Sequence, residues 1–195
     1  MRVVSNADSS TGRLLRADAA PAYATDPIAP EVEVLRLFDQ HGHRLLRYVG
    51  RFGLEPPDTE DIVQDVFLSL FRHVRLGRSR TNLRGWLFRV AHNLALKHRR
   101  RLRRNGPRGE TSGAGVAIDA PDPSNNPEEQ LVGLQRQARL LAVMHALPER
   151  DRRCLQLRAE GLRYREIAHV MGLSLGSVAK SLTRSLAKLN IVDGR

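Results

Sequence analysis

The sequence predicts an all-α fold, in which two small helical domains are joined by a flexible acidic linker and the C-terminal domain is a helix-turn-helix. Apolar residues recur at helical spacing in two stretches, separated by a Gly-, Pro- and Ser-rich segment without periodicity. The chain has 195 residues, of which 41% are hydrophobic and 5% aromatic, so its cores are small and built mostly of Leu, Val and Ala. We divide it into a disordered tail at 1–30, a helical domain at 31–104, the linker at 105–130 and a helical domain at 131–191.

The first 30 residues lack the long apolar run of a secretory signal. No stretch of about 18 apolar residues occurs anywhere, so we expect no membrane insertion. The single cysteine, Cys154, excludes an intramolecular disulfide and a multi-thiolate metal site. We therefore expect a cytoplasmic protein with no metal.

The first helix is predicted at about 31–51 and ends before Gly53, Pro56 and Pro57. Its apolar stripe is Val34, Leu35, Phe38, Leu45, Leu46 and Val49. A second helix follows, with Asp58 as its expected cap and an apolar stripe of Ile62, Val63, Val66, Phe67, Leu70 and Phe71. Its opposite face carries Glu60, Asp61, Gln64 and Asp65. These acids either complement the helix N-terminus in solvent or bind a partner.

A third helix, predicted at 83–104, has two distinct faces. One is apolar and comprises Leu83, Leu87, Val90, Ala91, Leu94 and His98. The other carries Trp86, Arg89, Asn93, Lys97 and Arg100. Such a stripe suits nucleic acid, because cationic groups bind phosphates, an Asn can both donate to and accept from a base edge, and an indole ring can stack on a base. Trp86 could instead pack partly in the core, beside a solvated basic face.

Charge is distributed in blocks, within a formal net charge of +11. Among Asp, Glu, Lys and Arg, residues 55–65 include only acidic side chains, residues 66–109 only basic ones, and residues 110–130 only acidic ones. A solvated helix normally mixes signs, so the long basic block indicates a polyanionic partner.

The second domain carries a helix-turn-helix between Gly161 and Leu189. Tyr164, Ile167, Ala168 and Met171 form its first apolar stripe, and Val178, Leu182, Leu186 and Leu189 form its second. Gly172 makes the turn and Ser174 caps the following helix. We expect Ser177, Lys180, Ser181 and Arg184 to read base edges in the major groove, and Arg163 and Arg165 to contact phosphates.

Three segments together resemble a known family: DTEDIVQDVFLSLFRHV, NLRGWLFRVAHNLALKHRRR and LPERDRRCLQLRAEGLRYREIAHVMGLSLGSV. They are similar to the two domains of sigma-70 family RNA polymerase sigma factors, most closely the small extracytoplasmic-function (ECF) type. The resemblance covers about 31–104 and 131–190. It implies a subunit that binds core RNA polymerase through the β′ clamp helices and the β flap, directs it to promoter DNA, and helps to melt the duplex. An anti-sigma factor is a further partner that the resemblance implies.

The resemblance assigns roles residue by residue. Asp61, Gln64 and Asp65 match the segment that binds the β′ clamp helices. The residues that match the part recognising and melting the minus-ten element are Arg78, Arg80, Asn82, Trp86, Arg89, Asn93, Lys97 and Arg100. The helix-turn-helix residues Arg163, Arg165, Ser174, Ser177, Lys180, Ser181 and Arg184 match the unit that reads the minus-thirty-five element. One departure is that Ala179 and Ser181 stand where the family commonly has basic residues.

Two other functions are weighed against this one. A helix-turn-helix transcription regulator that does not bind core polymerase would leave the acidic helix face and the Trp86 stripe without a role. A nucleic-acid enzyme would need chemistry that the sequence lacks, since it has no H-E-x-x-H spacing and no Gly-rich phosphate loop. We therefore expect no catalytic residue and no cofactor.

Overall fold

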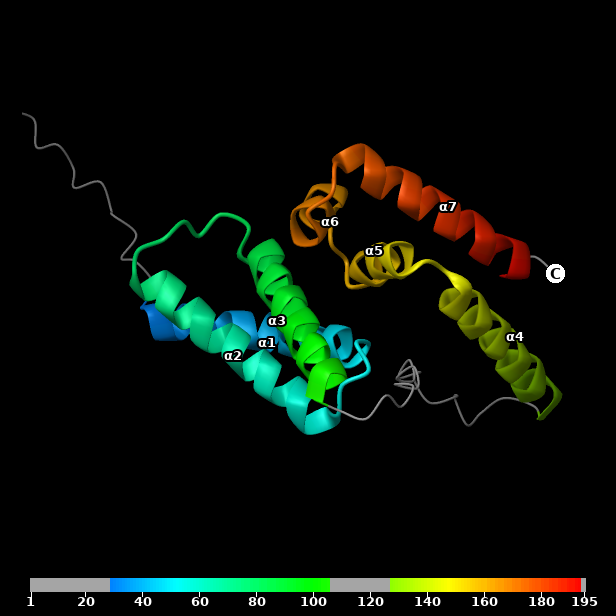
Figure 1. Ribbon diagram of the computed structural model, residues 1–195, viewed down its shortest axis with the longest axis horizontal. Helices are drawn as coiled ribbons and strands as arrows, with labels where there is room; N and C mark the ends of the chain where they lie inside the picture. The colour runs from blue at the N-terminus through cyan, green and yellow to red at the C-terminus, as the bar shows by residue number, and fades with distance from the viewer. Residues whose placement is uncertain (1–28, 106–126, 194–195) are drawn as a thin grey trace, which may run out of the picture.

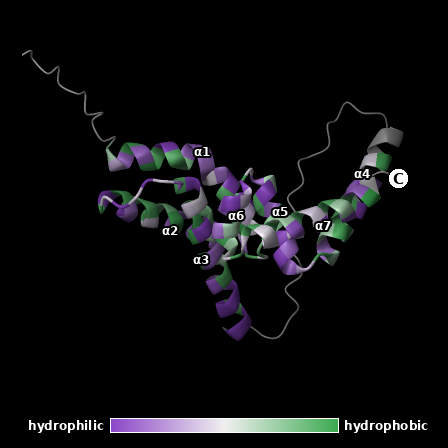
Figure 2. Cartoon of the chain, turned by 90° about the horizontal axis from the view of Figure 1, so that it is seen from above, coloured by the Kyte–Doolittle hydropathy of each residue, from purple (hydrophilic) through white to green (hydrophobic). Residues whose placement is uncertain are grey.

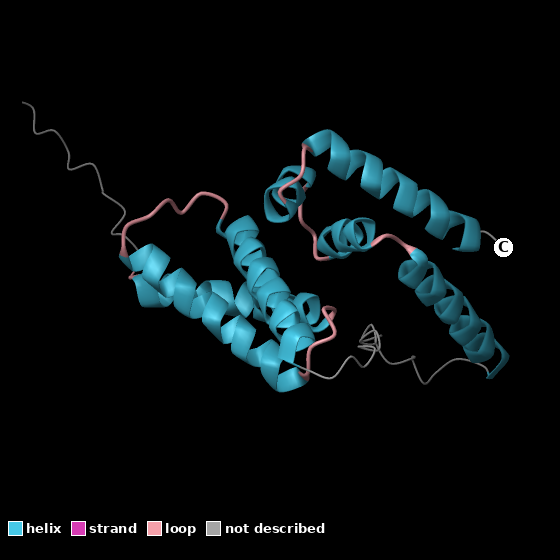
Figure 3. Cartoon of the chain, in the orientation of Figure 1, coloured by secondary structure: helices cyan, strands magenta, loops and turns pink. Residues whose placement is uncertain are grey.

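The computed structural model describes residues 29–105 and 127–193, which form seven helices and no strand (Figure 1, Figure 3). The helices are α1 (Pro30–Gly50), α2 (Pro56–Arg75), α3 (Leu83–Asn105), α4 (Pro127–Ala146), α5 (Glu149–Ala159), α6 (Tyr164–Met171) and α7 (Leu175–Asp193). The predicted all-α class is confirmed. The predicted tail falls almost entirely outside the described residues, as does most of the predicted linker. The linker's last four residues are the first turn of α4, because Pro127 is tolerated where a helix begins.

Helices α1, α2 and α3 enclose the first core, whose fully buried members include Leu45, Val66 and Leu87. Two residues of the predicted α1 stripe are exposed instead, Leu35 by 64% and Phe38 by 49%. Both lie in the N-terminal half of α1, where the Phe38 ring packs edge-on against Phe67 of α2 with centroids 5.0 Å apart. The core face of α1 is made by the predicted Leu45 and Val49 together with Leu37 and Tyr48.

Helix α3 has a second buried face that the apolar stripe did not predict. Phe88, His92 and Ala95 are buried beside Tyr48 of α1. The Tyr48 hydroxyl and His92 Nδ1 are 2.7 Å apart, and burial lowers the pKa of His92 to about 4. His92 is therefore neutral, and a hydrogen bond joins its Nδ1 to the Tyr48 hydroxyl. Asp58 is also not the cap expected of it, because α2 begins at Pro56 and Asp58 lies inside its first turn, where its carboxylate is 3.0 Å from His98 Nε2 of α3.

Helices α6 and α7 form the helix-turn-helix, α5 packs against both, and α4 packs along α7. Gly172 adopts the left-handed conformation, φ 64° and ψ 34°, and ends α6 as predicted. The Ser174 hydroxyl accepts the Ser177 backbone N–H at 3.2 Å, which confirms the predicted cap of α7. Two predicted stripe residues are exposed, Tyr164 by 38% and Leu186 by 43%. Their places in the core are taken by Val170, Ser181 and Ser185, all buried.

The two helical units touch each other, because α3 packs against α6 (Figure 1). The basic C-terminal end of α3 projects away from the other helices and is the most hydrophilic helix end in Figure 2. This arrangement leaves one side of α3 open to solvent and covers another side with the helix-turn-helix.

Candidate nucleic-acid interface

The predicted basic stripe of α3 lies on its open side. Arg89, Asn93, Lys97 and Arg100 are all exposed. Lys97 and Arg100 line a shallow groove with Arg103 and Arg104, and none of the described carboxylates pairs with any of these four. The helix therefore presents a continuous cationic surface with an amide among the cations, as phosphate binding and base contact require.

Trp86 stands at the start of this stripe and is half-buried. Its ring lies on the His73 ring of α2, with centroids 4.7 Å apart and planes tilted by 43°. The indole is thus held in place by packing and still has surface in contact with solvent. Both sequence interpretations of Trp86, partial packing and availability to a base, are compatible with this position.

The loop at 76–82 is fastened to the helices on both sides of it. His73 Nε2 donates to the Ser79 carbonyl at 2.8 Å, and Arg80 Nη1 lies 3.0 Å from the Glu33 carboxylate of α1. Arg78 is exposed. Sequence analysis missed Glu33 and His73, because neither belongs to an apolar stripe or to the basic block.

Asn82 ends this loop in the left-handed conformation, with φ 55°. Its Oδ1 accepts the Gly85 backbone N–H at 3.1 Å, so the side chain caps α3. A Cβ on Gly85 would lie 2.5 Å from the Asn82 amide, which explains why glycine stands there. Asn82, predicted to contact the minus-ten element, thus has a structural role in the described conformation.

The acidic face of α2 is fully available. Asp61, Gln64 and Asp65 are exposed, and no described residue forms an ion pair with them. Leu68 follows Asp65 on the same face and is 47% exposed. An apolar side chain beside two carboxylates makes this face suitable for a protein partner, and Leu68 is a member that the charge pattern alone did not reveal.

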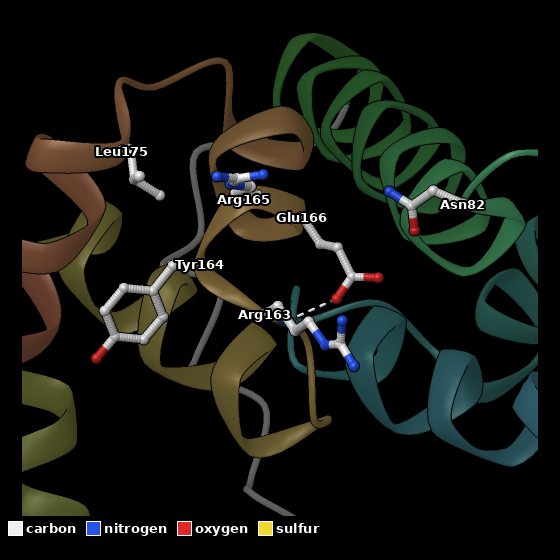
Figure 4. A pocket seen from close by; sticks show the side chains of 6 residues that line it. All are labelled: Asn82, Arg163, Tyr164, Arg165, Glu166 and Leu175. Atoms are coloured by element: carbon white, nitrogen blue, oxygen red, sulfur yellow. Dashed lines mark hydrogen bonds between the residues drawn. The ribbon is translucent and has the colours of Figure 1, made fainter.

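The N-terminal end of α6 borders an open cleft. Figure 4 shows that Arg163, Tyr164, Arg165 and Leu175 line it, with Asn82 of the first unit opposite. Arg163 and Arg165 are exposed, as expected for phosphate contacts. The Arg163 backbone N–H donates to Glu166 Oε2 at 2.6 Å, so Glu166 caps α6.

The side of α7 that we expected to contact base edges differs from the prediction at Ser181. Ser181 is 1% exposed, and its hydroxyl donates to the Asp151 carboxylate of α5, so it faces the core rather than DNA. Arg184 also binds Asp151, with its Nε 3.1 Å from Oδ2, although its side chain remains 45% exposed. Lys180 is exposed, as predicted, and so is Thr183, which sequence analysis did not name. A buried carboxylate attracts polar partners into the core, and a hydropathy pattern cannot show this.

Ion pairs connect the two units, and sequence analysis named none of them. Each one joins a carboxylate of the helix-turn-helix unit to guanidinium groups of the first: Glu160 to Arg47 and Arg51 at 2.9 and 2.8 Å, Glu166 to Arg84 at 2.6 Å, and Glu149 to Arg99 at 2.5 Å. The stripe residue Arg89 also lies 2.9 Å from His169 Nε2 of α6.

Burial distinguishes these pairs. The Glu160 side chain is 1% exposed and that of Glu149 is 47% exposed. Burial raises the pKa of Glu166, but hydrogen bonds from Arg84 and from the Arg163 N–H outweigh it and bring the pKa below its ordinary value. Glu160 and Glu166 are therefore the main charged contacts between the units.

Arg153 of α5 adds a contact of a different kind. Its guanidinium carbon lies 3.4 Å from the centroid of the Phe52 ring, and its Nη1 donates to the Arg51 carbonyl at 3.1 Å. Burial lowers the pKa of Arg153 to about 10, which still leaves it charged at neutral pH. The interface thus combines ion pairs with a cation stacked on an aromatic ring.

Comparison with known families follows the same division into two units. The family description "Sigma-70 region 2" matches residues 37–105, and "Sigma-70, region 4" matches residues 137–189. The chain belongs to the sigma-70 family of RNA polymerase sigma factors. Region 2 therefore contains the acidic face of α2, the loop at 76–82 and the basic stripe of α3, and region 4 contains the helix-turn-helix.

Curated relatives place this sigma factor in the ECF class. It is 32% identical over 157 residues to the ECF RNA polymerase sigma factor SigE of Mycolicibacterium smegmatis, covering 78% of this chain and 58% of that one. It is 31% identical over 163 residues to the RNA polymerase sigma factor CnrH of Cupriavidus metallidurans, covering 80% and 83%. It is 33% identical over 130 residues to the probable RNA polymerase sigma factor RfaY of Xanthomonas campestris, covering 66% of this chain and 32% of that one.

Two solved structures share the fold. One is CnrH in complex with the cytosolic domain of CnrY, with a TM-score of 0.53, 23% identity, and coverage of 83% of this chain and 88% of that one. The other is the sigma factor RpoE of Bartonella quintana in complex with the anti-sigma factor NepR, with a TM-score of 0.57, 20% identity, and coverage of 83% and 94%.

The described helices of this sigma factor include neither a membrane span nor a cluster of metal-binding side chains. None of its described helices is both long and apolar enough to cross a membrane. Within 29–105 and 127–193, no three His, Cys, Asp or Glu side chains gather in a way that could hold a metal ion.

Proposed function

We propose that this sigma factor binds core RNA polymerase, directs it to promoters and helps to open the DNA, while the covalent chemistry of transcription belongs to the polymerase. The observation that carries the proposal is that one chain has both an exposed carboxylate face and two cationic surfaces, one on each helical unit. A helix-turn-helix regulator without polymerase binding has no use for the exposed Asp61, Gln64 and Asp65 beside Leu68.

In this proposal region 2 recognises and melts the minus-ten element. Extracting a base from the duplex costs a few kcal/mol, which contacts on the released strand must offset. Trp86, held against His73, provides a ring at the start of the stripe. Asn93, about two turns further along α3, provides an amide among the cations. Arg89, Lys97 and Arg100 provide charge for the phosphates.

Region 4 reads the minus-thirty-five element with α7, and Arg163 and Arg165 contact phosphates beside it. We assign 31–104 to the region 2 domain, 105–130 to the connecting segment and 131–191 to the region 4 domain. The minus-ten and minus-thirty-five elements lie about 25 base pairs apart, or about 85 Å at about 3.4 Å per base pair. Region 2 and region 4 touch in the described conformation, with Arg89 within 2.9 Å of His169, so they must separate before both elements are bound.

The proposed partners are core RNA polymerase, through its β′ clamp helices and β flap, and promoter DNA. An anti-sigma factor is a further proposed partner. It is supported by the likeness in fold to RpoE, whose structure was solved with the anti-sigma factor NepR. We place the protein in the cytoplasm, where core polymerase and promoters are found.

The test is transcription in vitro with purified core polymerase on genomic DNA, followed by sequencing of RNA 5′ ends. We expect new start sites that depend on this chain, and we expect the double variant D61N/D65N to lose them together with co-elution with core polymerase. Asp39→Asn, which neutralises an exposed carboxylate on α1, is the matched control and should retain both. If the wild-type chain does not co-elute with core polymerase, the proposed function is refuted.

A further inference from the structure

We infer that Asp151 of α5 positions the recognition helix α7, so that Lys180 and Thr183 read base edges while Arg184 holds a phosphate at the edge of the groove. This inference rests on the proposed promoter recognition by region 4. It names the residues that determine upstream specificity and the residue that sets their orientation.

The first observation is the environment of the Asp151 carboxylate, which is 0% exposed. The Ser181 hydroxyl donates to its Oδ1, and Arg184 donates to its Oδ2 through both Nε and Nη2, at 3.1 and 2.5 Å. Burial raises the pKa of Asp151, but these hydrogen bonds outweigh it and hold the pKa below its ordinary value. The carboxylate is therefore charged, and it holds two points of α7 that lie almost one turn apart.

The second observation is the rotation of α7 about its own axis. Its buried residues are Val178, Ser181, Leu182 and Ser185, which share one side of the helix. At about 100° per residue, the opposite side is centred on Lys180 and Thr183, and both are exposed. Asp151 accepts a hydrogen bond from Ser181 on this buried side, so its removal would weaken the hold on this rotation of α7.

The exposed side has the chemistry of a base-reading surface. The Lys180 ammonium can donate to the O6 and N7 acceptors of guanine, and Thr183 offers a hydroxyl and a methyl group for the edge of an A·T pair. Gly176 and Ala187 lie on the same side and are exposed, so no large side chain keeps the helix from entering the groove. Both readers lie in the first half of α7, which is the part that enters the groove in a helix-turn-helix.

Arg184 lies at the edge of this side and not at its centre. Its contacts to Asp151 occupy Nε and one N–H of Nη2, while the remaining N–H groups belong to a side chain that is 45% exposed. A guanidinium anchored in this way cannot reach across the groove to a base, but it can donate to a phosphate beside it. Asp151 therefore fixes the direction in which Arg184 donates.

The experiment uses holoenzyme assembled from the full chain and core polymerase on a promoter library randomised upstream of a fixed minus-ten element. Transcript sequencing gives the base preference at every upstream position. We expect Lys180→Ala and Thr183→Ala each to abolish the preference at one or two positions. Lys188→Ala, an exposed lysine two turns further along α7, is the matched control and should leave every preference unchanged.

Arg184→Ala should lower transcription from all library members by a similar factor, with base preferences retained and the salt slope of binding reduced by about one. Asp151→Asn should have the effect of Arg184→Ala and should in addition weaken the base preferences read by Lys180 and Thr183, because it releases Ser181 as well as Arg184. A role for Asp151 in stability alone would lower the melting temperature and leave every base preference unchanged.

The inference is overturned if Arg184→Ala changes a base preference, or if Thr183→Ala and Lys180→Ala change none. These two surface variants do not depend on how Asp151→Asn folds. The proposed function fails in a different way, because the wild-type holoenzyme would then produce no promoter-dependent transcript from the library.

Discussion

Glu160→Gln should loosen the contact between region 2 and region 4. The Glu160 side chain is 1% exposed, and its two oxygens accept hydrogen bonds from Arg47 of α1 and from Arg51, which follows α1, at 2.9 and 2.8 Å. A hydrogen bond to a charged group contributes about 1.5–3 kcal/mol. The two arginine side chains are 40% and 17% exposed, so solvent screens part of this contribution. We expect Glu160→Gln to destabilise the contact between the two regions by about 2–3 kcal/mol. The ratio of closed to open molecules should fall about 30- to 150-fold.

The assay is fluorescence energy transfer between dyes on Gln40→Cys of α1 and Ala187→Cys of α7, both exposed positions. The native Cys154 is fully buried, and burial raises the pKa of its thiol, so it should not react in the folded protein. In Glu160→Gln the two regions should separate at a lower salt concentration than in the wild type, because charge pairs hold them together. Glu55→Gln, an exposed carboxylate at the start of α2, should behave like the wild type. An unchanged transfer efficiency and an unchanged salt midpoint in Glu160→Gln would refute the reasoning.

Three further outcomes are expected. The pKa of His92 is lowered from 6.5 to about 4, so between these values the unfolded chain binds a proton that the folded chain does not. The free energy of unfolding should therefore fall by about 2 kcal/mol from pH 7.5 to 5. In urea titrations, His92→Gln should lack this pH-dependent loss of stability. Gly172→Ala should lower the free energy of unfolding by about 1–2 kcal/mol, because φ at Gly172 is +64°. Gly176 is helical, and a Cβ there would meet no atom within 4 Å, so Gly176→Ala should raise the melting temperature. Asn93→Ala should reduce permanganate-reactive open complexes more than initial promoter binding, and equal losses would contradict its proposed role.

The helices themselves could be predicted from the sequence, because their signals are local. The apolar period, the prolines and the left-handed Gly172 act on neighbouring residues, and the structure places α3 and the helix-turn-helix where those signals indicate. The exposed basic stripe of α3 could be predicted for the same reason, since residues four apart share one face of a helix whatever surrounds it.

Which side of a helix becomes buried depends on what packs against it, and here prediction was incomplete. Helix α3 buries Phe88 and His92 as well as its apolar stripe, because α1 covers that side and the Tyr48 hydroxyl is hydrogen-bonded to His92. Phe38 belongs to the α1 stripe by spacing but is 49% exposed, since only part of its ring is covered by Phe67.

The amino-acid order alone determined the class of fold, the two helical units and the sign of the charge on each surface, because helix formation and charge are properties of short segments. The tertiary structure alone decided that Asp151 draws Ser181 into the core, and that Glu160 and Glu166 of region 4 meet arginines of region 2. These contacts join residues far apart along the chain, between 30 and 113 positions. A buried carboxylate must find its partners wherever the fold brings them, so no local pattern could have specified those pairs.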